Sequence, residues 1–115
     1  MLRAENVTRK TTLIEQGRLA DNPWTRFKGL IGAKALHPGD GLMIVPCNGV
    51  HCMFMSIPID VLYVSAKNRV LAIDRGMRPW AIGRILRASR YVLELPAGQA
   101  DSTGTQVGDV IDVTY

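Results

Sequence analysis

The chain has 115 residues, an apolar fraction of 47% and a formal net charge of +4 at neutral pH. This length suits one domain covering residues 1–115, and the apolar content argues against intrinsic disorder. No apolar run approaches the roughly 20 residues that a membrane helix needs. The N-terminus shows no secretory signal, and the two cysteines form no disulfide framework, so we expect a cytoplasmic protein with reduced thiols.

Two strands are predicted at the N-terminus. Residues 2–8 alternate weakly between apolar and polar, and residues 11–15 are rich in β-prone side chains. The polar pair Arg9-Lys10 joins them, and residues 16–18 either extend the second strand or form a bulge in it.

One principal helix is predicted near residues 23–31. Asn22 suits the N-cap, and Pro23 suits the first helical position, where a missing N–H is tolerated. Apolar side chains then recur at helical spacing, which places them on one face: Trp24, Phe27, Leu30 and Ile31. We interpret this face as packing on a sheet, because aromatic residues that stack on bases would need to be exposed.

The rest of the chain is read as short strands separated by turns. Residues 42–45 show no alternation and are expected to be buried on both faces. In residues 59–64, Ile59 and its alternate neighbours point one way and Asp60 points the other. Residues 74–90 form a basic connection. Further strands are predicted at residues 50–54, 70–73, 91–95 and 110–115.

Together these elements predict a mainly β (α+β) domain. With many strands and little else to cover them, the chain would best remove its sheet edges by partial closure. We therefore expect a compact, partly closed, antiparallel β-barrel-like sheet with the single principal helix.

Several motifs in order along the chain resemble the family known as domain of unknown function 192. They occupy residues 26–32, 41–44, 51–55, 58–60, 79–80, 91–98 and 108–109. The resemblance implies a small β-rich fold from bacteria or archaea, with some members exported, and it implies no activity. The chain departs from the family pattern at Ile31 (usually Met), Cys52 (usually Thr) and Ser56 (usually basic).

Cys47, His51 and Cys52 suggest a metal site or a nucleophile. Zinc prefers thiolate and imidazole ligands, and His37 is a candidate fourth ligand. However, the spacing is not that of a zinc knuckle, and adjacent residues on a strand face opposite sides. A thiol–imidazole pair of Cys47 and His51 could also act as a nucleophile. We favour a buried thiol and a hydrogen-bonded histidine, and we predict neither a metal nor a cofactor.

Asp60 and Glu94 are lone carboxylates within apolar strands. Burying a carboxylate is costly unless it is paired or hydrogen-bonded. Asp60 could therefore be a structural anchor that accepts backbone or arginine donors. Alternatively, it belongs to a pocket of perturbed groups in an apolar cleft. The predicted binding site consists of His51, Met55, Asp60, Arg78, Trp80 and Glu94.

The predicted function is binding of a small molecule or a protein partner, without catalysis. One alternative is an enzyme that uses Cys47, His51 and Asp60, which requires a nucleophile and base open to solvent. Another is a nucleic-acid-binding module that uses the basic residues between Lys67 and Arg90. This alternative requires one contiguous exposed basic patch.

Overall fold

The computed structural model describes residues 2–20, 37–46, 57–78 and 85–115. This part of the chain contains seven strands in one sheet and the short helix α2 (Gln99–Ser102). The strands are β1 (Leu2–Asn6), β2 (Thr11–Ala20), β3 (Gly39–Ile44), β4 (Ile59–Ser65), β5 (Val70–Met77), β6 (Ser89–Pro96) and β7 (Ile111–Thr114). The described part of the chain contains no helix long and apolar enough to cross a membrane.

The sheet has the strand order β5-β4-β6-β3-β2-β1-β7. All neighbouring pairs are antiparallel except β2 and β3, which run parallel. The parallel pair departs from the predicted antiparallel sheet. The connection at residues 21–38 is long enough to allow it, because parallel neighbours need a crossover of a dozen or more residues.

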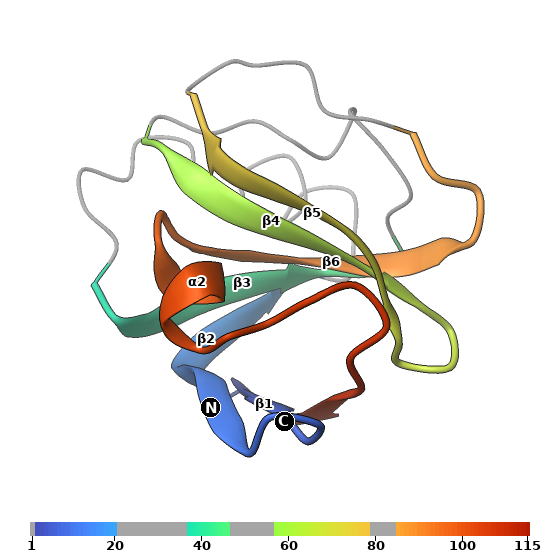
Figure 1. The fold of residues 1–115 in the computed structure, drawn as a ribbon, viewed down its shortest axis with the longest axis horizontal. Coiled ribbons are helices and arrows are strands. Elements are labelled where there is room, and N and C mark those ends of the chain that lie inside the picture. Colours follow the sequence, from blue (N-terminus) through green and yellow to red (C-terminus); the bar gives the residue numbers. More distant parts are fainter. Residues whose placement is uncertain (1, 21–36, 47–56, 79–84) are drawn as a thin grey trace.

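The sheet curls so that its two edge strands, β5 and β7, come close to each other where both strands begin (Figure 1). Arg69, just before β5, forms an isolated bridge with Val110, just before β7. The Val70 amide donates to the Asp109 carbonyl at 2.9 Å, and the Ile111 amide donates to the Asn68 carbonyl at 2.8 Å. These bonds satisfy part of both sheet edges, and they confirm the predicted partial closure.

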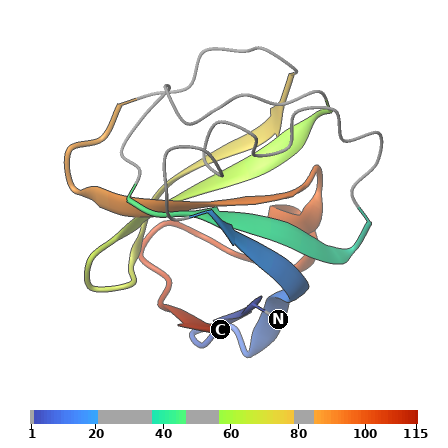
Figure 2. The same ribbon diagram turned by 180° about the vertical axis from the view of Figure 1, so that it is seen from behind.

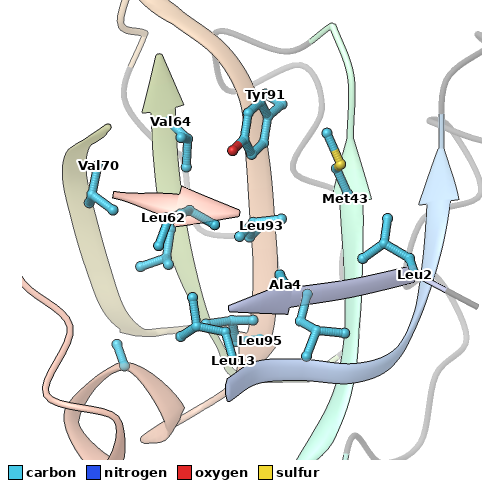
Figure 3. Close-up of a cluster of buried hydrophobic side chains, with 13 residues drawn as sticks. Leu2, Ala4, Leu13, Met43, Leu62, Val64, Val70, Tyr91, Leu93 and Leu95 are labelled. Atoms are coloured by element: carbon cyan, nitrogen blue, oxygen red, sulfur yellow. The ribbon is translucent and has the colours of Figure 1, made fainter. Parts of the chain in front are cut away.

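Each face of the sheet carries its own apolar cluster. The inner face is defined by buried residues from all seven strands and α2, whose side chains converge in Figure 3: Leu2, Ala4, Leu13, Ile14, Met43, Leu62, Val64, Val70, Tyr91, Leu93, Leu95, Ala100 and Ile111. The outer face is defined by a second buried cluster on β3–β6: Leu42, Ile44, Ile59, Val61, Tyr63, Ala72, Met77 and Val92. The alternation predicted for residues 59–64 is therefore confirmed. Of the strand predicted at residues 42–45, residues 42–44 are buried on both faces and Val45 is half-buried.

Two elements differ from the sequence-based expectation. β5 continues to Met77, although the sequence predicts a connection from Asp74 onward. Helix α2 lies where the sequence shows only turn signals. The predicted helix near residues 23–31 and the predicted strand at residues 50–54 lie outside the described residues. Figure 2 shows the same curled sheet from behind.

Candidate functional site

Three of the six predicted site residues lie in the described part of the chain: Asp60, Arg78 and Glu94. The other three, His51, Met55 and Trp80, lie outside it, as do both cysteines.

Asp60 lies on the inner face of β4 and is only 1% exposed. Its Oδ1 accepts a hydrogen bond from the Gly76 amide at 2.8 Å. Its Oδ2 accepts from the amides of Gly98 at 3.0 Å and Ala100 at 2.9 Å. One carboxylate thus joins the end of β5 to the start of α2. This is the backbone-anchored arrangement that the structural interpretation of Asp60 requires.

Glu94 lies on the opposite, outer face and is fully buried. In the sheet, Val61 is the neighbour of Glu94, whereas Asp60 is the neighbour of Leu95. Because alternate residues of a strand face opposite sides, the two carboxylates project from different faces. The structure therefore does not bring Asp60 and Glu94 together, and only Glu94 belongs to the apolar outer face.

A second carboxyl and a hydroxyl share the outer face with Glu94. Asp74, Val61, Glu94 and Leu42 form one row across β5, β4, β6 and β3. The Tyr63 Oη donates to Asp74 Oδ2 at 2.9 Å. Asp74 and Glu94 stand two strand spacings apart, about 10 Å between backbones. The face thus combines apolar surface with a few polar groups on neighbouring strands.

This polar set is not a ready-made metal centre. Within the described ranges, no group of three or more histidine, cysteine, aspartate or glutamate residues is arranged to hold a metal ion. The chemistry visible on the outer face is hydrogen bonding by carboxyl oxygens and a tyrosine hydroxyl.

Arg78 is exposed and directly follows β5, at the end of the sheet that carries Asp60. Arg75 lies at the same end and pairs with Asp101 at 2.8 Å. The remaining described basic residues of this stretch lie at the other end, near the β4–β5 turn or the start of β6: Lys67, Arg69, Arg87 and Arg90. The eight-residue strand β5 separates the two ends by about 25 Å. Among described residues, therefore, the basic stretch is not one contiguous patch.

A polar network that the sequence does not predict joins the β1–β2 turn to the C-terminal segment, and three of its members, Asn6, Thr105 and Asp109, are buried. The Asn6 Nδ2 donates to Thr105 Oγ1 at 3.0 Å and to Asp109 Oδ2 at 2.9 Å. Arg9 binds the same carboxylate through two nitrogens, Nε at 2.9 Å and Nη2 at 3.2 Å. The Gln106 amide also donates to Asp109 Oδ2, at 2.9 Å. We call these five residues the clasp.

The pKa of Asp109 reflects two opposing effects. Burial raises it, but hydrogen bonds from Arg9, Asn6 and the Gln106 amide, together with the charge of Arg9, outweigh burial and lower it below the usual value.

The sequence signal for the clasp is weak. Asn and Gly-Asp are turn residues, and this does not reveal a contact between residues 103 positions apart. A shallow depression of about 330 Å³ adjoins the β1–β2 turn, and its lining includes Asn6 and Lys10 but no predicted site residue.

Two crystal structures share this fold. A protein of unknown function from Novosphingobium aromaticivorans gives a TM-score of 0.76 at 20% identity, covering 96% of this chain and 82% of that one. A protein from Sinorhizobium meliloti, named as a candidate transcription regulator, gives a TM-score of 0.79 at 23% identity, covering 97% and 91%. At these identities the likeness establishes the fold alone.

Sequence relatives agree with the resemblance seen in the motifs. A UPF0127 protein of Pyrococcus furiosus is 28% identical over 112 residues, which cover 93% of this chain and 94% of the relative. A UPF0127 protein of Pyrococcus abyssi is 30% identical over 100 residues, or 82% of each chain. The family model DUF192, described as Uncharacterized ACR, matches residues 5–113. The chain therefore belongs to the DUF192 family, whose function is uncharacterised.

Proposed function

We propose that this protein is a non-enzymatic binding domain for a small molecule, with its site on the outer face around Glu94. The observation behind this proposal is a fully buried carboxyl in the middle of an apolar face. An apolar residue at this position would avoid the cost of burying a charge. A carboxyl in such a place is typical of a site in which few polar groups orient a mostly apolar ligand.

The chemistry of the outer face suggests which groups a ligand would carry. A carboxylate offers hydrogen-bond acceptors, and the Tyr63 hydroxyl donates to Asp74 on the same face. A ligand with a hydrogen-bond-donating group, such as an amine, next to an apolar body would suit a face of this chemistry. His51, Met55, Arg78 and Trp80 remain candidate ligand contacts from the sequence.

The enzyme alternative has less support. A catalytic Asp60 would need to be open to solvent and within reach of a nucleophile. Its carboxylate is instead buried, and both oxygens accept backbone hydrogen bonds. The nucleic-acid alternative also lacks support among the described residues, because their basic side chains divide between two ends of the sheet.

A thermal-shift screen of the purified protein against amine-bearing metabolites tests this function. A ligand raises the melting temperature by mass action, with about 2.7 kcal/mol of stabilisation at 100 times its Kd. We expect a hit with the wild type and its loss in Glu94→Gln, which keeps the side-chain volume. Glu5→Gln is the matched control, because Glu5 is half exposed and pairs only with Arg3 among the described residues.

Two results would contradict the proposal. One is a ligand shift that persists unchanged in folded Glu94→Gln. The other is that no amine-bearing metabolite stabilises the wild type while protein partners or oligonucleotides, added to the same assay, do.

A further inference from the structure

We infer that Asp60 is a positioning residue for the outer face, acting from the inner face through a β-bulge in β5. Its importance for binding rests on the function proposed above, whereas the geometry it controls is independent of any ligand.

The bulge lies directly opposite Asp60. Ile59 pairs with Met77 and Val61 pairs with Asp74, so that two residues of β5, Arg75 and Gly76, oppose the single residue Asp60. In a regular strand, residues three positions apart point to opposite faces. Here Asp74 accepts a hydrogen bond from the Tyr63 hydroxyl on the outer face, and Met77 packs in the outer cluster. The extra residue is what places both on one face.

Asp60 supplies the contact that holds the bulge. Gly76 has a φ of +58°, in the left-handed region that favours glycine. A bulge disrupts the ladder of backbone hydrogen bonds locally, and the Gly76 amide instead donates to Asp60 Oδ1. The amides of Gly98 and Ala100 fix the second oxygen and therefore the orientation of the whole carboxylate.

This arrangement couples the two faces. Without the bulge, continued pairing would place Arg75 opposite Asp60 and Gly76 opposite Ile59. Met77 would then leave the outer cluster, and the chain would depart from β5 toward Arg78 in another direction. Asp60 thus determines which residues of β5 share a face with Glu94.

NMR of the full chain, with labelled methionine methyls, tyrosine rings and backbone amides, tests this coupling. Asp60→Asn removes an acceptor while keeping the side-chain volume. Gly76→Ala disfavours the left-handed backbone conformation, and because an added Cβ at Gly76 meets nothing within 4 Å, its effect is conformational rather than steric. Gly76→Asn is the conservative variant, since Asn tolerates this conformation. Asp101→Asn is the control, because it alters the α2–β5 contact without touching Asp60.

We expect Asp60→Asn and Gly76→Ala to shift the Met77 methyl and Tyr63 ring resonances while Met43, on the inner face, stays in place. Gly76→Asn should restore the wild-type positions, and Asp101→Asn should leave them unchanged. The inference is overturned if Gly76→Ala leaves Met77 and Tyr63 unmoved, or if Asp60→Asn perturbs only the α2 amides. If Asp60→Asn does not fold, the Met77 and Tyr63 resonances of the two Gly76 variants decide whether the bulge controls the outer face. Because no ligand is used, failure here is separate from failure of the binding screen.

Discussion

Single side chains in this protein hold together segments that are distant in sequence. Asp60 serves three backbone amides from β5 and α2, an arrangement that compensates the cost of burying its charge. Glu94, one register position away on the neighbouring strand, faces the other way. Two carboxylates that look equivalent in the sequence therefore have different surroundings.

At this scale we expect Asp60→Ala to lower the free energy of unfolding by about 3 kcal/mol or more. The substitution leaves three backbone donors without their acceptor, and each unsatisfied buried donor costs about 1–3 kcal/mol. Urea unfolding at neutral pH measures the difference. Asp101→Ala, which breaks an exposed ion pair with Arg75, should change stability by less than about 1 kcal/mol. Equal losses in the two variants would show that the Asp60 contacts are weak.

The parallel pairing of β2 and β3 depends on two glycines that face each other in the register, Gly17 and Gly41. A Cβ built at Gly41 would lie 2.6 Å from Ile14 Cδ1 and 3.1 Å from the Glu94 carbonyl oxygen. The close approach of β3 to both neighbouring strands therefore requires the absence of a side chain at this position.

At the scale of these elements, Gly41→Ala should destabilise the protein by about 1–3 kcal/mol through overpacking. Ile14→Val deletes the atom in closest conflict and by itself should cost about 0.5–1.5 kcal/mol. In the double variant, the loss in free energy of unfolding should be smaller than the sum of the two single-variant losses by at least about 0.5 kcal/mol. A double-mutant cycle measured by chemical denaturation tests this. Strict additivity would mean that the strands separate instead of clashing with Ile14.

For the whole molecule, closure is reinforced at the clasp, where the β1–β2 turn meets the C-terminal segment. Asp109 is the centre of this network, with donors from Asn6, Arg9 and the Gln106 amide. The same segment provides the carbonyl that pairs with Val70 at the start of β5. The clasp thus lies beside the backbone bonds through which the curled sheet closes.

The clasp predicts an acid-sensitive contribution to stability. The folded pKa of Asp109 lies below its unfolded value, so its stabilising effect is fully present above the unfolded pKa and is lost as the pH falls through the folded pKa. The stability advantage of the wild type over Asp109→Asn should be constant at pH 6–7 and shrink below about pH 4. Unfolding curves of both proteins across this range measure it. An advantage that stays constant down to pH 2 would contradict this role of the Asp109 charge.

The sequence by itself determined the local features: the positions of most described strands, the faces on which residues 59–64 alternate, and the family. The strands and their faces follow from a two-residue side-chain period and from the turn residues between strands, both of which act within a few neighbouring residues. The family follows from the motifs along the chain. Of the candidate site, the sequence identified Asp60 and Glu94 as unusual because each is a charge within an apolar strand.

Only the tertiary structure decided how these features combine. The register of β4 against β6 places Asp60 and Glu94 on opposite faces, and the bulge in β5 puts Asp74 beside Tyr63 on the outer face. Helix α2 has four residues, too few to repeat the 3.6-residue helical period, and its start is held by Asp60 of β4. Register, closure and the Asn6–Asp109 contact depend on segments that meet only when the sheet curls, so no local pattern encodes them.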